Sequence, residues 1–382
     1  MNLLIDDLER AIFENRPNRF TVQCFLRGGS IKAYLPNPGR LWELLLPGRV
    51  LYLKRNLSEN KLPYTVMAVE KDGIPILLHT HLANTLVKGL IKKKMLPGFE
   101  DTELIKREAT LGKGRYDFLL ARKDKQLVLE VKTCTLFNNM LAMFPDAVTL
   151  RGSRHLSGLA ELAEKGMDSA VLFVVQWPFV QYFMPEHHTD LEFAKNLLRV
   201  REKILVKAIS LRFEEDLLSP SEVRELIIPW KIIEREASDR GSYIIIFFLP
   251  EDRSINIGEL GRISFKRAWY LYVGSARKYL SKRIQRHQRK RKKFHWHIDY
   301  LAAEAFFYKV LPIRTSADFE CEIAKRLREI AGWSISGFGS SDCACKSHLF
   351  GMRDDPIKSP RFIEMVMDFR MGMIERELDG VY

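Results

Sequence analysis

The fold of the central part of the chain is decided by two runs, Arg115-Tyr-Asp-Phe-Leu-Leu-Ala121 and Gln126-Leu-Val-Leu-Glu-Val-Lys132, which a charged turn at Lys123-Asp124 separates. Branched and aromatic residues on both sides of a short polar turn are typical of a β-hairpin. If the turn is centred there, positions whose numbers sum to 247 face each other. Asp117 then lies opposite Glu130, with the Cβ atoms about 5 Å apart. The sequence therefore predicts two carboxylates on one face of one hairpin.

Alternation along the second strand adds an ammonium group to this face. Glu130 and Lys132 point the same way, while Val131 points into the core. Paired carboxylates repel each other unless a divalent cation neutralises them, and Mg²⁺ or Mn²⁺ suits such oxygen ligands. A cation here would polarise a phosphoryl group and activate water, and Lys132 could orient that water. The alternative is that the Glu-x-Lys pattern forms only a solvated ion pair on a strand surface.

Outside this hairpin the pattern changes along the chain. The first ~80 residues alternate short apolar runs with turns such as Pro36-Asn-Pro-Gly39, which predicts a small β-barrel. From about His81 the pattern is α/β, and we expect a helix that begins at Asp146 with its side chain as the N-cap. The dense apolar strand Ser242 to Leu249 begins a second α/β domain. The chain is therefore predicted to contain several domains.

Charge and composition limit the class of protein. Lys+Arg 61 against Asp+Glu 48 in 382 residues leaves a net charge of +13, which favours a polyanionic partner such as DNA or RNA. The stretch Met1 to Phe13 carries acids where a secretion signal needs positive charge, and no run approaches the ~18 apolar residues of a membrane span. Five cysteines are not typical of a disulfide framework. We therefore expect a cytoplasmic protein with no membrane partner and with reduced cysteines.

Several motifs in the first 235 residues together resemble a known family. They are Asn18-Arg-Phe20, Pro36-Asn-Pro-Gly-Arg40, Glu43-Leu-Leu-Leu-Pro-Gly48, Asn84, Arg115-Tyr-Asp-Phe118, Glu130-Val-Lys132, Phe144-Pro-Asp-Ala147 and Arg151-Gly-x-x-His155. The set resembles the sugar fermentation stimulation protein family, SfsA. The resemblance implies an OB-like nucleic-acid-binding barrel over residues 1–80 and a PD-(D/E)XK nuclease-like α/β domain over residues 81–235. Asp117, Glu130 and Lys132 take the catalytic motif positions.

The same resemblance suggests further residues for this site. Glu108, on the preceding strand, is a candidate third metal-binding acid beside Asp117 and Glu130. Arg151 and His155 lie one helical turn apart and could face phosphate. The alternative for His155 is a packing role on the helix surface.

A second group of features lies in the C-terminal part of the chain. Gly241-Ser-Tyr243 begins one strand, and Tyr270-Leu-Tyr-Val-Gly-Ser-Ala276 ends another. The following helix carries Arg283 and His287 on one face. Between Lys282 and Lys293, eight of twelve residues are Lys or Arg. A charge run is usually a solvated face and a strand tyrosine is usually core, but together these features favour a phosphate-binding surface.

These features resemble the GIY-YIG nuclease family, and Trp296-His-Ile-Asp-Tyr300 and Gly337-Phe-Gly-Ser-Ser-Asp-Cys343 make the resemblance more specific. It implies a GIY-YIG-like α/β domain over residues 236–382, with a C-terminal amphipathic helix near residues 362–377. Two departures stand out, because Ser242 replaces the usual Ile or Val and about 28 residues separate the two motifs. An inserted hairpin is implied, and if it distorted the sheet the two tyrosines would not meet.

The resemblance also implies roles for individual residues. A hydroxyl of Tyr243 or Tyr272 helps to activate the nucleophile, Glu320 holds one Mg²⁺, and Arg283 stabilises phosphoryl charge. His287 shares the helix face with Arg283 and joins the predicted catalytic set.

One motif near the C-terminus offers ligands for a different metal. Asp342-Cys-Ala-Cys-Lys-Ser-His348 has Cys-x-Cys-x-x-His spacing, and His295 or His297 would complete a tetrahedral Zn²⁺ site. The more common outcome of such a pattern is a reduced cysteine pair without metal.

The sequence thus predicts a metal-dependent nuclease that hydrolyses DNA or RNA, with two candidate active centres. The alternative is a non-catalytic, regulatory DNA-binding protein of the sugar fermentation stimulation type. The choice between DNA and RNA and the oligomeric state stay open. The predicted nucleic-acid-binding residues are Arg40, Arg115, Arg151, His155, Arg286, Arg289, Lys290, Arg291, Lys292 and Lys293.

Overall fold

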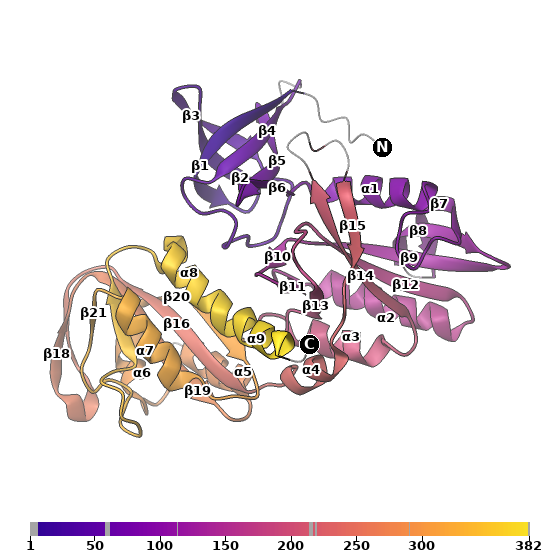
Figure 1. The fold of residues 1–382 in the computed structure, drawn as a ribbon. Helices are drawn as coiled ribbons and strands as arrows, with labels where there is room; N and C mark the ends of the chain where they lie inside the picture. The colour runs from indigo at the N-terminus through magenta and orange to yellow at the C-terminus, as the bar shows by residue number, and fades with distance from the viewer. Residues whose placement is uncertain are drawn as a thin grey trace. The chain divides into compact units, whose positions relative to one another are not determined.

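The structure is a computed structural model that describes residues 7–57, 62–112, 114–213, 217, 220–289 and 291–380 (Figure 1). Lys290, one of the predicted nucleic-acid-binding residues, lies outside this set. The chain divides into two compact units. The first comprises the chain up to Glu186 together with Glu192–Ile233. The second comprises His187–Leu191 together with the chain from Glu234 onward.

The first unit begins with a β-barrel, as the sequence predicts. Its strands are ordered β3-β2-β1-β4-β5-β6, and a parallel pairing of β3 with β5 closes the sheet on itself. Apolar side chains such as those of Val22, Cys24 and Val66 fill the interior and are fully buried. The strands are β1 Leu8–Asn18, β2 Thr21–Leu26, β3 Gly29–Tyr34, β4 Val50–Arg55, β5 Tyr64–Lys71 and β6 Ile74–Leu77.

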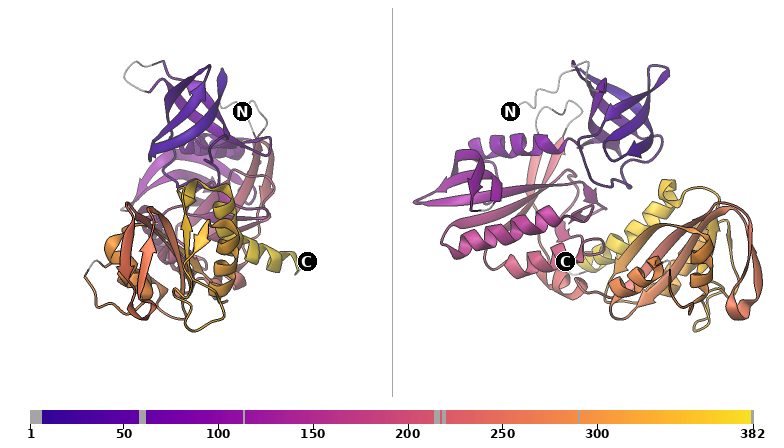
Figure 2. Two further views of the ribbon diagram at one scale, coloured as in Figure 1. Left: turned by 90° about the vertical axis from the view of Figure 1, so that its left-hand side faces the viewer. Right: turned by 180° about the vertical axis from the view of Figure 1, so that it is seen from behind.

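A mixed sheet between helices follows the barrel, with the order β15-β14-β12-β9-β8-β7. Helix α1 covers one face, where its apolar residues share a core with Leu129, and α2 and α3 cover the other, where theirs share a core with Val128 (Figure 2). Alternate residues of β9 thus serve two cores. The elements are α1 Thr80–Lys92, β7 Thr102–Leu111, β8 Gly114–Arg122, β9 Lys125–Cys134, α2 Leu150–Glu164, β12 Asp168–Val175, α3 Leu191–Val200, β14 Leu205–Phe213 and β15 Pro220–Glu225. A small sheet of β10 Leu136–Phe137, β11 Leu141–Phe144 and β13 Tyr182–Pro185 adjoins them, and α4 Trp230–Glu236 follows.

The hairpin of β8 and β9 has the register that the sequence predicts. Phe118 pairs with Leu129, Leu120 with Leu127, and so on to the turn, so the paired numbers sum to 247. On its other side β9 pairs in parallel with β12, where Val171 lies beside Glu130. The strand that carries Glu130 is therefore an interior strand with both faces covered.

The prediction that Asp146 caps a helix was wrong. Helix α2 begins at Leu150, and its N-cap is Thr149, whose hydroxyl accepts a hydrogen bond from the N–H of Gly152. The Asp146 carboxylate instead accepts from the N–H of Leu41 at 2.7 Å. A cap residue is recognised from local sequence, whereas this aspartate serves a backbone group about a hundred residues away.

The second unit is built on a five-stranded sheet with the order β20-β16-β19-β22-β21. Helices α5 and α6 share a core with the face that carries Tyr243 and Tyr272, and α7 packs against β19, β22 and α8. The elements are β16 Gly241–Leu249, β17 Arg253–Asn256, β18 Arg262–Phe265, β19 Ala268–Ala276, α5 Leu280–Gln288, α6 His297–Glu304, β20 Phe306–Arg314, α7 Glu320–Ile330, β21 Trp333–Ser334 and β22 Leu349–Met352. Short 3-10 turns lie at Gly258–Leu260 and Pro356–Lys358.

The predicted inserted hairpin is present, and it leaves the main sheet intact. Strands β17 and β18 form a separate two-stranded sheet between β16 and β19. The pairing of β16 with β19 runs without a register shift from Gly241 opposite Ala276 to Leu249 opposite Ala268. The insertion therefore extends the connection and does not separate the two tyrosine strands.

The C-terminal helix is confirmed, with an irregular turn in its middle. Helix α8 spans Pro360–Met367, a π-helical turn spans Asp368–Gly372, and α9 spans Met373–Asp379. Its apolar side, including Phe362, Val366 and Met371, is buried. Among the described residues, no helix combines the length and the apolar character that crossing a membrane would require.

The double burial of β9 predicts a large cost for truncation within it. Leu129 is fully buried in the core beneath α1, so Leu129→Ala should lower the free energy of unfolding by about 2–5 kcal/mol. Leu57 is 99% exposed, so Leu57→Ala is a matched control that should change it by less than about 0.5 kcal/mol. Urea unfolding followed by circular dichroism measures both. Equal effects of the two substitutions would contradict this packing of β9.

Candidate active sites

The first candidate site lies where the ladder between β8 and β9 stops. The last pair of the ladder is Phe118 with Leu129, and the next residue on β8, Asp117, hydrogen-bonds to β9 through its side chain. One carboxylate oxygen accepts from the N–H of Val131 at 2.8 Å, and the other accepts from the Asn84 side chain of α1 at 2.6 Å. Asp117 is thereby held next to β9 from two directions.

Glu130 is the buried centre of this site, with 3% of its surface exposed. Its Oε1 accepts from the Lys132 ammonium at 2.5 Å and also bonds to Nδ1 of His155, a residue of α2. Its Oε2 is buried and has no hydrogen-bond partner among the described residues. A buried carboxylate oxygen without a partner is costly, and a hard divalent cation is a ligand that would satisfy it. The donor set therefore fits a bound cation.

The two carboxyl groups differ in how strongly they hold a proton. Burial raises the pKa of Asp117 to about 6, and the negative charge of Glu130 adds to this effect. Burial also raises the pKa of Glu130, but the hydrogen bond from His155 and the charge of Lys132 outweigh it, so the net shift is downward. Glu130 is therefore ionised at neutral pH, and Asp117 exchanges its proton near pH 6.

The other predicted residues of the first unit make separate local contacts. The Arg151 side chain lies 3.4 Å from Nε2 of His155, on the exposed side of α2. Glu108 forms an ion pair with Arg115 at 2.8 Å, and both side chains are largely exposed. The predicted role of Glu108 as a third metal ligand stays a prediction. In the barrel, the Arg40 guanidinium lies 5.0 Å from the ring centre of Trp42.

The second candidate site contains the two tyrosines of the sequence motifs. Tyr243 lies opposite Gly274 on β19, and the Tyr243 and Tyr272 rings are 6.5 Å apart between centroids. A Cβ atom on Gly274 would lie 2.4 Å from the hydroxyl oxygen of Tyr243. The glycine of the second motif therefore makes room for the tyrosine of the first. The tyrosines do meet despite the insertion.

His287 links these tyrosines to helix α5. Its Nε2 lies 2.9 Å from the hydroxyl oxygen of Tyr243, and all three side chains are buried. Burial and, to a smaller extent, the charge of Lys292 lower the pKa of His287 to about 4. Burial raises the pKa of both Tyr243 and Tyr272 above the ordinary tyrosine value. At neutral pH the site holds a neutral imidazole beside two neutral phenols.

Arg283 and Glu320 meet across Ser275. Arg283 donates to the backbone oxygen of Ser275 at 3.0 Å, and the Ser275 hydroxyl donates to Oε2 of Glu320. Oε1 of Glu320 lies 2.9 Å from Nδ1 of His348. These four residues line one cleft of about 820 Å³. Burial raises the pKa of Glu320, but the hydrogen bonds from His348 and Ser275 and the charge of Arg283 outweigh it, so Glu320 stays ionised.

The basic run is only partly a solvated surface. Asp299 is fully buried and binds Arg286 at 3.0 Å and Lys292 at 2.9 Å. Lys292 is 7% exposed in its side chain, so its charge is used inside the domain. The other described Lys and Arg residues of the run are exposed, and they are Lys282, Arg283, Arg289, Arg291 and Lys293. These side chains can reach an external phosphate.

Three known families match three separate stretches of the chain. Residues 15–78 match the SfsA N-terminal OB domain, and residues 81–216 match the sugar fermentation stimulation protein RE domain. A sugar fermentation stimulation protein homolog of Methanothermobacter thermautotrophicus is 37% identical over 201 residues, which cover 52% of this chain and 84% of that protein. The chain belongs to the sugar fermentation stimulation protein family.

Other members of the SfsA family agree. The homolog of Shouchella clausii is 37% identical over 209 residues, covering 53% of this chain and 90% of that protein. The solved structure of Pyrococcus furiosus SfsA in complex with Ca²⁺ has a TM-score of 0.55 and 29% identity, and the match covers 60% of this chain and 99% of that one. Asp117, Glu130, Lys132 and His155 all lie within the matched RE domain.

The second unit lies beyond these SfsA relatives. Residues 242–371 match the domain of unknown function DUF123, which includes both tyrosines, His287 and Glu320. The likeness to GIY-YIG nucleases therefore stays a prediction.

Three residues of these sites escaped assignment from the sequence. Asn84 belongs to an SfsA motif, but nothing local indicates that it holds Asp117. Ser275 directly follows the second tyrosine motif, and its contact with Glu320 joins residues 45 positions apart. Asp299 lies in the Trp296-His-Ile-Asp-Tyr300 motif, and an acid so close to a basic run was a usable signal for an internal ion pair.

The raised pKa of Asp117 predicts that cation binding depends on pH. Its proton must leave before both carboxylates can serve as ligands, so Ca²⁺ affinity should fall up to about tenfold per pH unit below pH 6 and level off above it. Isothermal titration calorimetry between pH 5 and 8 measures this. The slope should persist in His155→Asn, since His155 is not one of the proposed cation ligands, and vanish in Asp117→Asn. Affinity of the wild-type protein that does not change between pH 5 and 7 would contradict the assignment.

Proposed function

We propose that the chain is a divalent-cation-dependent nuclease of the PD-(D/E)XK type that hydrolyses phosphodiester bonds in DNA or RNA at the Asp117–Glu130–Lys132 site. One observation carries this proposal: Oε2 of Glu130 is buried beside a second acid and lacks a hydrogen-bond partner among the described residues. A structural carboxylate would be expected to have its oxygens paired. The Ca²⁺ complex of the Pyrococcus furiosus relative supports a divalent cation in this family fold.

Asp117 and Glu130 would hold the cation, with Mg²⁺ or Mn²⁺ as the working ions. When bound, such a cation polarises the phosphoryl group and lowers the pKa of a water molecule. Asn84 and the Val131 N–H fix the Asp117 carboxylate so that it need not reorganise during the reaction. The sheet and helix packing around β9 excludes water from the side of Glu130.

Lys132 and His155 share Oε1 of Glu130, and they supply the positive charge and the proton donors of the site. Lys132 can stabilise negative charge that develops on the oxygens of the pentacoordinate phosphorus, or orient the attacking water. His155 fixes Glu130 from α2, and Arg151 extends this contact toward solvent, where a phosphate of the substrate can bind. Each group therefore has a distinct task in binding or positioning.

The barrel offers a surface for holding the nucleic-acid strand. Phe20, Phe25 and Tyr34 are apolar rings with 40–46% of their surface exposed. Exposed rings next to basic residues are typical of surfaces on which bases stack while phosphates are neutralised. Besides Arg151, we assign Arg40 and Arg115 of the first unit to phosphate contacts.

For the second unit we propose a second active centre of the GIY-YIG type. Nε2 of neutral His287 can accept a hydrogen bond from the Tyr243 hydroxyl, which would orient that hydroxyl toward the attacking water. Glu320 would hold one Mg²⁺, and Arg283 would stabilise the phosphoryl charge across the shared cleft. The exposed residues Arg289, Arg291 and Lys293 would bind the backbone of the substrate.

The alternative function is a non-catalytic, regulatory DNA-binding protein. One observation favours it for the second unit, because burial raises the pKa of both tyrosines and so works against their ionisation. Such a protein would bind nucleic acid with the same affinity in Mg²⁺ and in EDTA.

Cleavage of labelled single-stranded, duplex and branched DNA and RNA tests these functions. We expect Mg²⁺-dependent cutting that falls at least ~100-fold in Glu130→Gln, because that substitution removes a cation ligand but keeps the side-chain volume. Asp124→Asn, on the exposed turn of the same hairpin, is the matched control and should cut at the wild-type rate.

Glu320→Gln and the double variant then divide the activity between the centres. Residual cutting in Glu130→Gln that disappears in the double variant would assign it to the second unit. Tight, salt-sensitive binding with no cutting by the wild-type protein would favour the regulatory function and overturn the nuclease proposal.

A further inference from the structure

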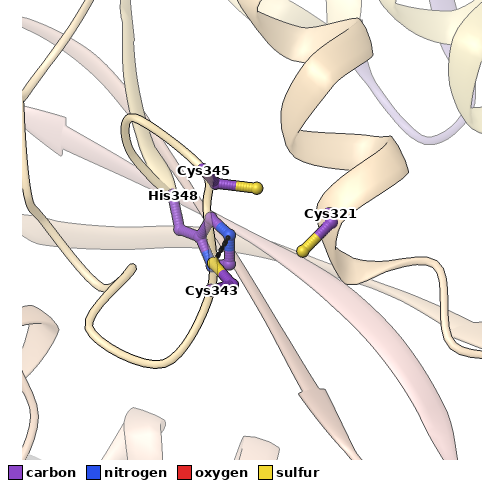
Figure 3. Close-up of side chains that lie close together, drawn as sticks. All are labelled: Cys321, Cys343, Cys345 and His348. Carbon is purple, nitrogen blue, oxygen red and sulfur yellow. Dashed lines mark hydrogen bonds between the residues drawn. The ribbon is translucent and has the colours of Figure 1, made fainter.

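Three cysteines and one histidine of the second unit converge outside the tyrosine site. They are Cys321, Cys343, Cys345 and His348, whose sulfur and nitrogen ligand atoms all lie within 4.8 Å of one another (Figure 3). Cys321 comes from the first turn of α7, and the other three come from the loop that precedes β22. None of the cysteines is in a disulfide bond. The fourth ligand is thus Cys321, and not His295 or His297 as the sequence suggested.

The separations suit one tetrahedral ion. With Zn–S near 2.3 Å and Zn–N near 2.0 Å, ligand atoms around zinc lie roughly 3.5–3.8 Å apart. In the structure Nε2 of His348 lies 3.4 Å from Sγ of Cys343, and no separation in the set exceeds 4.8 Å, which is about 1 Å above the tetrahedral value. Small side-chain rotations would complete the geometry.

The second nitrogen of His348 is engaged in the way that metal-bound histidines require. Nδ1 lies 2.9 Å from Oε1 of Glu320, so that nitrogen donates its proton to the carboxylate and Nε2 is left as a lone-pair donor. His348 itself is buried with 1% exposed surface. A carboxylate that orients a buried histidine toward three thiols is an independent sign of a metal site.

The loop that contains Cys343 and Cys345 is held mainly by hydrogen bonds at its base. Its base is closed by hydrogen bonds from Gly337 N–H to Lys346 O at 2.9 Å and from His348 N–H to Phe338 O at 2.8 Å. Between these contacts Ser341, Asp342 and Ala344 are exposed, so no apolar side chain there anchors the tip. A metal ion would join this tip to the first turn of α7.

We propose that Cys321, Cys343, Cys345 and His348 bind one Zn²⁺ ion that joins the loop before β22 to the first turn of α7. All four ligands come from the protein, which makes the site closed and structural, not catalytic. Three thiolates and an imidazole select zinc over Mg²⁺ or Ca²⁺, which prefer oxygen ligands. Through His348 the ion also fixes the position of Glu320 in the cleft that both residues line.

Metal analysis of the full chain tests this proposal without reference to any nuclease activity. The protein purified under reducing conditions and dialysed should contain one zinc ion per chain by mass spectrometry. Replacement by Co²⁺ should give the visible absorption bands of tetrahedral cobalt together with thiolate charge-transfer bands. Cys321→Ser should weaken zinc binding by at least ~100-fold, since loss of even an outer contact costs 10–100-fold.

His295→Ala is the control, because His295 is exposed and was the alternative ligand; it should retain the zinc. If Cys321→Ser failed to fold, the cobalt spectrum of the wild-type protein would still decide the coordination. Protein that takes up no zinc on reconstitution, a cobalt spectrum without thiolate bands, or Cys321→Ser with wild-type affinity would each overturn the proposal. None of these outcomes depends on whether the chain cleaves nucleic acid.

Discussion

The first unit depends on two carboxyl groups placed together inside a packed sheet. Asp117 and Glu130 share a site that both backbone register and burial impose, and their charges repel each other there. The structure relieves this only in part, through Lys132 and His155 on one oxygen of Glu130. The repulsion that remains is what a bound cation would neutralise. A packed sheet with no such requirement would be more stable with apolar residues at these positions.

Buried charge is also the organising element of the second unit, but there it is fully paired. Asp299 has no exposed surface and binds Arg286 and Lys292, and the hydrogen bonds from these cations outweigh burial and lower its pKa to about 2. The Trp296 ring centre lies 4.1 Å from the Arg286 guanidinium and 5.1 Å from the Arg283 guanidinium. Asp299 therefore fixes two side chains of the basic run from inside the domain. By contrast, Oε2 of Glu130 has no hydrogen-bond partner among the described residues, and the proposed cation site rests on this difference.

Local sequence predicted those parts of the fold that depend on local rules. Alternation and a two-residue turn were enough for the β8–β9 register, and the spacing of Arg283 and His287 placed both on α5. The interactions that were missed join distant residues. Asp146 bonds to Leu41 and not to its own helix, and Cys321 has no neighbour in sequence that marks it as a ligand. Such contacts are products of tertiary packing, which periodicity does not encode.

In the function proposed above, the first unit holds a divalent cation between Asp117 and Glu130. The most direct test is anomalous diffraction from crystals of the full chain soaked with Mn²⁺ at pH 7.5. We expect a manganese peak about 2.0–2.6 Å from Oε2 of Glu130 and close enough to the Asp117 carboxylate for that group to bind it. A well-ordered site with no peak there, or with Lys132 or a water molecule bonded to Oε2 in its place, would contradict it.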